Sequence, residues 1–303
     1  MIALTLRCTN VKIKNMNENG IYIEELPELN KPILIAGFDG WGNALDVSKG
    51  MVIYLISKLK AKHFAKVNPD SFFRYDEKRP VVNIENGDLK SLSPQGGSFY
   101  ATQTGSGGKD LVILKADEPN LRWSYFVNEL FSLCEKLGVE TIITLGSMYD
   151  NILHTDRIIS GIVSNQDLFL KLKEKNVIPI SYHGPSSIHS IIYSEGQKRG
   201  FQSISLWYHC SYYLQGITHY GALSSLGTLL SFLGEFELDI EDLETNWKKI
   251  NIQIQELIEK NPEFQDVVDK LRKAKIKGSW ASVKESVKKD EKVINLKDFL
   301  EPR

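Results

Sequence analysis

The sequence lacks any hydrophobic run long enough to cross a membrane. Its longest apolar runs, ILIAGF and TIITLG, have the length of a strand, whereas a membrane-spanning helix needs about 20 apolar residues. The N-terminal MIALTLRCTNVKIKN has no basic stretch before its short apolar start and does not resemble a signal peptide. We therefore expect a cytoplasmic protein without a membrane partner.

An excess of charge and a cysteine framework are also missing. The 37 Lys and Arg residues nearly balance the 38 Asp and Glu residues, so the net charge is -1, which does not favour nucleic acid as a partner. The three cysteines, Cys8, Cys134 and Cys210, are widely spaced and odd in number. They predict neither a disulfide framework nor a zinc knuckle, and we expect them to be reduced.

Several nucleotide-binding and catalytic motifs are absent. The run TGSGGKD (104–110) has a misplaced first Gly and an Asp after its Lys, so it is not a phosphate loop. The run GFDGWGN (37–43) reads GxxGxG, which does not fit the dinucleotide fingerprint. No GxSxG, HExxH or Cys/His zinc spacing occurs. We expect no cofactor and no metal.

What is present is an alternation of strand-like and helix-like segments between residues 21 and 238. Such an alternation predicts an α/β fold with three α/β/α layers and a mostly parallel sheet. Residues 1–20 are polar and are expected to be a flexible N-terminus, and 239–303 a helical C-terminal region with a charged tail. Asn86-Gly87 separates two strand-like runs and predicts a hairpin. The expected strands are 20–26, 31–38, 61–67, 80–85, 88–92, 110–116, 139–145, 177–182 and 201–208, and the expected helices are 43–59, 120–137, 166–174, 186–199, 220–233 and 239–275.

Polar and aromatic side chains follow five of these strands, where ligands bind in open parallel sheets. A run of polar groups after TIITLG, in LGSMYDNILHTDR (145–157), is the densest of them. We predict one crevice that these strand ends share. Its candidate residues are Asp39, Glu118, Arg122, His154, Arg157, Tyr182 and His209.

Each candidate also has a structural interpretation. Asp39 can serve the turn before Gly40, and Glu118 can complement a helix dipole or pair with Arg122. His154 can be a buried corner histidine; in the functional interpretation it faces Glu118 and nearby carboxylates raise its pKa. Two tryptophans, Trp41 and Trp123, are expected to serve packing and not binding.

In the same stretches the sequence resembles the proteasome assembly chaperone 2 family in its bacterial and archaeal form. The match spans about residues 30 to 275. The segments that carry it are ILIAGFDGWGNALDVSKGMVIYL, VNPDSFFRYDEKRPVV, LVILKADEPNLRW, LGVETIITLGSMYDNILHTDR, YHGPSSI and ISLWYHCSYYL.

The resemblance implies a three-layer fold related to purine nucleoside phosphorylases and peptidyl-type hydrolases. It also implies a homo-oligomer, with a trimer favoured, and a proteasome-like or other protein assembly as partner. Members often have Pro-His-Thr-Arg-Pro where this chain has Leu153-His154-Thr155-Asp156-Arg157, so the polar centre departs from the family pattern. The C-terminal Phe299-Leu300-Glu301-Pro302-Arg303 lacks the hydrophobic-Tyr-X tail that some relatives use for docking.

Besides a purely structural oligomeric scaffold, two functions therefore remain in view. The first is a cytoplasmic binding or assembly protein without its own catalysis. The second is a hydrolase-like or phosphorylase-like enzyme that holds a small anionic substrate with Arg157 or Arg122. In that enzyme His154 or Glu118 acts as acid or base.

Overall fold

The computed structural model describes residues 20–105 and 107–276. Within these ranges no helix is both long and apolar enough to span a bilayer. The strands are β1 Ile21–Ile23, β2 Ile33–Asp39, β3 Lys62–Val67, β4 Val81–Glu85, β5 Asp88–Ser93, β6 Gly97–Thr102, β7 Leu111–Asp117, β8 Thr141–Asp150, β9 Ile159–Val163, β10 Val177–Pro179 and β11 Gln202–Ser211. The helices are the 3-10 turn η1 Ala44–Asp46, then α1 Val47–Lys58, α2 Pro69–Phe72, α3 Trp123–Leu137, α4 Gln166–Glu174, α5 Ile188–Lys198, α6 Tyr220–Gly234, α7 Glu241–Lys260 and α8 Pro262–Ile276.

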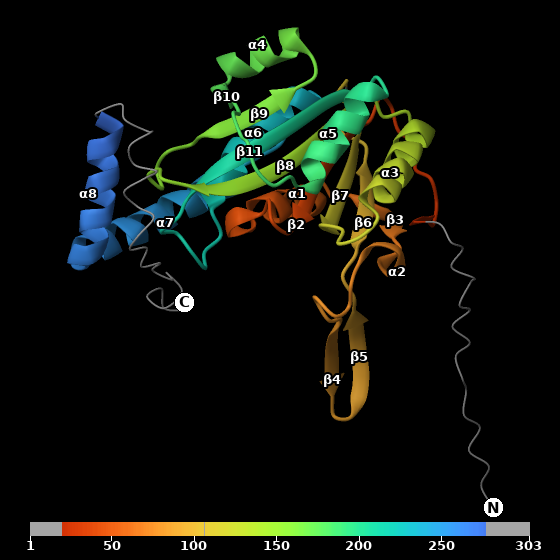
Figure 1. Cartoon of the computed structure of the whole chain (residues 1–303), viewed down its shortest axis with the longest axis horizontal. Helices are drawn as coiled ribbons and strands as arrows, with labels where there is room; N and C mark the ends of the chain where they lie inside the picture. The colour runs from red at the N-terminus through yellow and green to blue at the C-terminus, as the bar shows by residue number, and fades with distance from the viewer. Residues whose placement is uncertain (1–19, 106, 277–303) are drawn as a thin grey trace, which may run out of the picture.

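Nine of the strands form one mixed sheet in the order β1-β3-β6-β7-β2-β8-β11-β9-β10 (Figure 1). The central strands β7, β2, β8 and β11 are parallel. The strands β6, β3 and β1 continue the sheet antiparallel on one side, and β9 pairs antiparallel with β11 on the other. The predicted α/β fold is confirmed, with the parallel part confined mainly to the centre of the sheet.

Helices cover both faces of this centre, which gives the three layers. Along β2, Ile33 and Ile35 pack with α1 and α6, whereas Leu34 and Ala36 pack with α3 and α5. A strand buried on both faces is apolar at consecutive positions and not at alternate ones. This is why ILIAGF was recognisable in the sequence as a buried strand.

Two strands were not predicted, and one of them changes the geometry of the strand ends. The strand β6 joins β3 to β7, and β9 lies antiparallel to β11. Because β10 is parallel to β9, it runs opposite to the central strands. The expectation that β10 ends at the same edge as the other four strands is therefore wrong. The chain after β10 returns to that edge as a loop.

The C-terminal helices α7 and α8 pack against two loops of the α/β body. Their apolar faces form a third cluster with Tyr213 and Leu214, which follow β11. Arg157, after β8, forms a two-pronged ion pair with Glu244 of α7, with N···O distances of 2.7 and 3.0 Å. The predicted helical region is therefore attached to the body by apolar and charged contacts. The predictions for residues 1–19 and for the tail after 276 lie outside the described residues.

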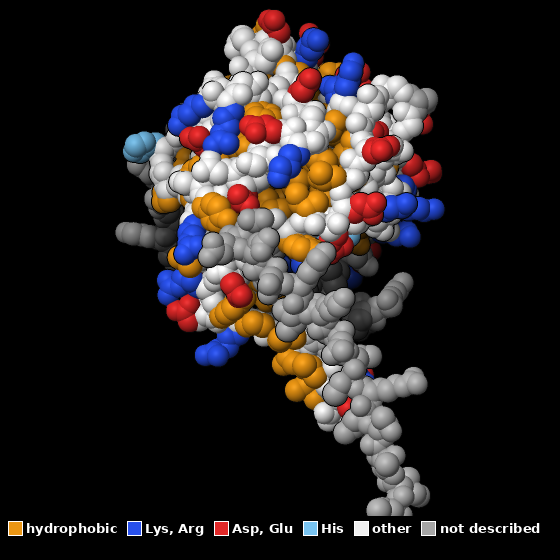
Figure 2. Space-filling model, turned by 90° about the vertical axis from the view of Figure 1, so that its right-hand side faces the viewer, with side chains coloured by type: hydrophobic (Ala, Val, Ile, Leu, Met, Phe, Trp, Pro, Cys, Tyr) orange, Lys and Arg blue, Asp and Glu red, His pale blue; other side chains and the backbone are white. Residues whose placement is uncertain are grey.

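The hairpin β4–β5 projects from the body, as Figure 1 shows. Asn86 and Gly87 both have positive φ at its turn, as the sequence predicted. The register shifts after Asn83, which brings Leu89 opposite Ile84 while Leu92 stays opposite Val82. One extra residue in β5 therefore places all four apolar side chains on one face. They are between 49% and 63% exposed, and orange side chains mark the projection in Figure 2.

Candidate functional site

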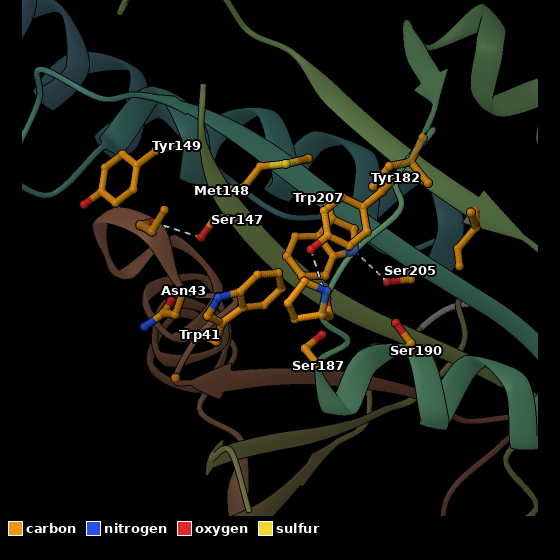
Figure 3. Close-up of a pocket in the computed structure, with 15 residues that line it drawn as sticks. Trp41, Asn43, Ser147, Met148, Tyr149, Tyr182, Ser187, Ser190, Ser205 and Trp207 are labelled. Atoms are coloured by element: carbon orange, nitrogen blue, oxygen red, sulfur yellow. Dashed lines mark hydrogen bonds between the residues drawn. The ribbon is translucent and has the colours of Figure 1, made fainter. Parts of the chain in front are cut away.

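A pocket of about 650 Å³ lies at the carboxyl ends of β2, β8 and β11 (Figure 3). This is the edge where ligands bind in open α/β sheets, and the volume falls in the usual range for ligand pockets. The wall segments come from the β2–η1 loop, the end of β8, β11, the loop after β10 and the start of α5. The lining residues are Gly40, Trp41, Asn43, Ala44, Ser147, Met148, Tyr149, Ile162, Ile180, Tyr182, Pro185, Ser187, Ser190, Ser205 and Trp207.

The indole of Trp207 forms the floor of the pocket because two glycines make room for it. A Cβ atom on Gly146 would lie 2.6 Å from the Trp207 ring, and one on Gly42 would lie 3.0 Å from it. Trp207 Nε1 donates a hydrogen bond to Ser205 Oγ at 3.0 Å, which fixes the ring on the sheet. Gly146, at the end of TIITLG, is therefore required by the Trp207 side chain of the neighbouring strand β11.

Two exposed aromatic residues stand over this floor. Trp41 is 60% exposed and Tyr182 is 59% exposed. The ring centre of Trp41 lies 6.4 Å from those of Trp207 and Tyr182. Tyr182 is held by a hydrogen bond from its hydroxyl to the Pro185 carbonyl at 3.0 Å. The expectation that Trp41 serves packing is wrong, because most of its surface faces solvent and the pocket.

The pocket is electrically neutral. None of its lining side chains is an acid, a lysine or an arginine. Beneath Trp207 lies the buried ring of His189, at 5.1 Å between ring centres. Burial lowers the pKa of His189 to about 4, so this ring is uncharged at neutral pH.

Glu118 connects the two sides of the pocket. One carboxylate oxygen accepts a hydrogen bond from the Trp41 amide at 3.1 Å, and the other accepts one from the Ile188 amide at 2.8 Å. Ile188 is the first residue of α5, so Glu118 also complements the dipole of that helix. The residue predicted as an acid or base thus positions Trp41 against α5.

A second, polar cleft of about 430 Å³ adjoins the pocket and contains Asp39 and Glu118. Asp39 binds Lys49 Nζ at 2.8 Å and accepts from Asn43 at 3.2 Å. Burial raises the pKa of Asp39, but the bond to Lys49 and the charges of Lys49 and Lys78 outweigh it and hold this pKa below its usual value. Asp39 is therefore a paired carboxylate that fixes the loop carrying Trp41.

His154 lies in a different place from the one expected. Its Nδ1 and backbone N both lie within hydrogen-bond distance of the Tyr213 hydroxyl, at 2.8 and 2.7 Å. Its ring also contacts Trp247 of α7, whereas Glu118 binds the amides of Trp41 and Ile188. Burial lowers the pKa of His154 to about 4, against a smaller opposing effect of Asn251. The expected raised pKa is wrong, because removal from water outweighs the nearby carboxylate Asp156.

The two candidate arginines do not line the aromatic pocket or the polar cleft. Arg157 is occupied by Glu244. Arg122 is exposed in the N-cap position of α3, with a φ of 53°. Neither is placed to hold a small anion there.

His209 joins three strand ends in a network that resembles a catalytic triad. Its Nδ1 lies 2.8 Å from Asp150 Oδ2, and its Nε2 lies 2.9 Å from Ser160 Oγ. A hydrolytic serine stands exposed on a sharp turn, but Ser160 is 2% exposed and lies within β9, paired with β11 and β10. The network therefore ties β8, β11 and β9 together, and its serine is shielded from substrates.

Of the seven candidates, the structure brings Asp39, Glu118 and Tyr182 together around the pocket and its polar neighbour. His154 and Arg157 lie at the joint with α7, His209 lies in the sheet network and Arg122 lies at the start of α3. The sequence reasoning missed Trp207 and Ser187. The signal for Trp207 was its place near the end of the SISLW strand, at the same edge as Gly146.

The fold and this site define a class: a three-layer α/β/α protein with a neutral aromatic pocket at the carboxyl edge of its central strands. The model of the PAC2 family matches residues 34–258, and the chain belongs to this family. No curated protein sequence matches the chain.

Solved structures show the same fold. A PAC2 family protein of Streptomyces avermitilis is 24% identical, covers 78% of this chain and 99% of its own, and has a TM-score of 0.69. A proteasome-assembly chaperone homologue of Mycobacterium tuberculosis is 23% identical over 78% of this chain and 99% of its own, with a TM-score of 0.70. PbaB, an archaeal proteasome activator of Pyrococcus furiosus, is 22% identical over 78% of this chain and 97% of its own, with a TM-score of 0.62.

Proposed function

We propose that this chain is a cytoplasmic binding or assembly protein that docks on a protein partner through the aromatic pocket. The observation that carries the proposal is the pair of exposed aromatic side chains, Trp41 and Tyr182, over the floor made by Trp207. Exposed Trp and Tyr residues around a preformed hollow are typical of binding hot spots. An apolar side chain of the partner would be buried among three rings.

The family supports a protein assembly as the partner. The relative in Mycobacterium tuberculosis is a proteasome-assembly chaperone homologue, and PbaB of Pyrococcus furiosus is an archaeal proteasome activator. We propose a proteasome-like or other multi-subunit assembly for this chain, and no reaction of its own. Mass spectrometry of proteins that co-purify with the intact chain from its source cell tests this. Proteins retained by the wild type should be lost from a Trp41→Ala/Tyr182→Ala variant.

We also propose self-association, with a trimer favoured. The apolar face of the β4–β5 hairpin supports it, because a two-stranded hairpin is marginally stable alone and gains by covering such a face. Every copy carries the same face, so the hairpins of neighbouring copies can cover one another.

Light scattering at micromolar concentration should give a multiple of the 34.4 kDa chain mass. A Val82→Lys/Leu92→Lys variant should lower that mass, because it places four charges in each pair of apposed hairpins. A wild-type mass near 34 kDa would contradict self-association, and an oligomer that the variant leaves intact would place the interface elsewhere.

A further inference from the structure

We propose that the pocket selects an uncharged aromatic ring, so that the partner's anchoring side chain is a neutral aromatic residue. This inference rests on the docking function proposed above and specifies its ligand. It is carried by the charge of the pocket, by the orientation of its rings and by how those rings are held.

The charges around the pocket disfavour an ionic anchor. No carboxylate belongs to the lining. Both oxygens of Glu118 already accept backbone hydrogen bonds, and Asp46 accepts one from the Asn43 side chain. His189 is neutral beneath the floor, and Asp39 is paired with Lys49. An anion would lose its hydration in the pocket without gaining an opposite charge. A cation would gain the cation–π attraction of the rings but no carboxylate to neutralise it.

The orientation of the rings favours a planar partner. Trp207 is T-shaped to Trp41, with an angle of 69° between the rings, and Tyr182 is tilted by 52° from Trp41. A ring lying flat on the Trp207 floor would therefore meet Trp41 edge-on, at an angle that aromatic pairs prefer. Each such aromatic pair strengthens binding by roughly two- to tenfold, in addition to the gain from burying apolar surface.

The floor is held rigidly, which preserves this geometry in the free protein. The backbone at Gly146 and Gly42 lies directly against the Trp207 ring, and the hydrogen bond to Ser205 fixes the edge of the indole. Glu118 fixes the backbone of Trp41. A preformed site loses less conformational entropy on binding than one that must be ordered.

The test is a set of small probes with similar apolar size and different character. Ligand-observed NMR titrations of the full chain would compare N-acetyl-phenylalaninamide with N-acetyl-leucinamide, tetramethylammonium and phenylacetate. We expect the phenyl amide to bind about tenfold more tightly than the leucyl amide. The cation and the carboxylate should not displace it.

Matched variants connect the preference to the rings. Trp41→Leu should reduce the preference for the phenyl amide over the leucyl amide to about threefold or less. The substitution removes one aromatic wall of the pocket and keeps an apolar one. Phe232→Leu, on α6 and 40% exposed away from the pocket, should leave it unchanged. Gly146→Ala should also weaken binding of the phenyl amide, since the added methyl group displaces the Trp207 ring.

The outcomes separate this inference from the docking function. Equal binding of the phenyl and leucyl amides, or tighter binding of tetramethylammonium, would overturn aromatic selection and leave docking in place. Probes that fail to bind at millimolar concentration would also overturn it. Partner retention that survives loss of both Trp41 and Tyr182 would overturn the docking function itself.

Discussion

Replacing Trp247 with alanine is expected to lower the free energy of unfolding by about 3–5 kcal/mol, the cost of truncating a buried tryptophan. Trp247 joins α7 to the body. Its ring stacks on His219 at 4.7 Å between ring centres and 13° between planes. It also lies against Gly221, where a Cβ would be 2.8 Å from the indole. The variant should therefore loosen α7 and α8 before the sheet.

Urea unfolding at pH 7 measures the loss, and limited proteolysis locates it. Ile252→Ala is the matched control, because Ile252 lies on the same helix and is 60% exposed. Its effect should stay within about 0.5 kcal/mol, as for most surface positions. A loss below about 1 kcal/mol for Trp247→Ala, or cleavage that does not begin in α7 and α8, would contradict the joint described here.

Lowering the pH is expected to destabilise the protein already at pH values well above those at which carboxylates titrate. Burial lowers the pKa of His154 and His189 to about 4 and that of His219 to about 3, from an ordinary 6.5. As the pH falls, the unfolded chain therefore binds these protons first. The stability from the neutral rings is complete above about pH 6.5 and declines down to about pH 4.

The loss between pH 7 and pH 5 is roughly 2 kcal/mol for each histidine, or about 6 kcal/mol for the three. The charged groups near these histidines do not remove this loss of stability. Asp156 and Arg272 lie near His154, and Arg157 lies near His219. Glu244, whose pKa is lowered to about 2 mainly by its bond to Arg157, adds a separate loss that begins below about pH 4.5.

Unfolding curves at pH 7, 6 and 5 check this expectation. His189→Leu should flatten the pH dependence by about one third, since it removes one of three titrating rings. His183→Gln is the control, because His183 is exposed, and it should change nothing. Equal stability at pH 7 and pH 5 would show that these histidines are not neutral and buried.

The layered α/β fold could be predicted because its central strands and helices carry strong patterns. ILIAGF and DLVILKA are apolar at consecutive positions, and α3 has one apolar face. The strands β6 and β9 lack such runs. In β9, Ile159 faces the core while Ser160 binds His209 on the other face. Pairing with β11 and β10 makes this segment a strand, and local periodicity does not reveal pairing between distant segments.

The candidate site was only partly predictable for a similar reason. Strand ends located Asp39 and Glu118 near the pocket, because the carboxyl edge of parallel strands is a sound guide. Tyr182 reaches the pocket only through the loop after β10, a strand that itself runs the other way. His154 and Arg157 follow the same kind of strand end, but Trp247 of α7 packs on His154 and Glu244 of α7 binds Arg157. A helix about 90 residues further along the chain therefore decides the surroundings of both side chains. The role of Gly146 depends on Trp207 of the neighbouring strand, which spacing alone does not reveal.

The most direct measurement of the central claim is the affinity of the purified chain for its isolated partner assembly. Isothermal titration would compare the wild type with Trp41→Ala/Tyr182→Ala and with Phe232→Ala as an equally aromatic surface control. Because hot-spot aromatics cost 2 kcal/mol or more when truncated, we expect the double variant to bind at least about 30-fold more weakly and Phe232→Ala to bind like the wild type. Unchanged affinity of the double variant, with its fold intact, would contradict docking through the aromatic pocket.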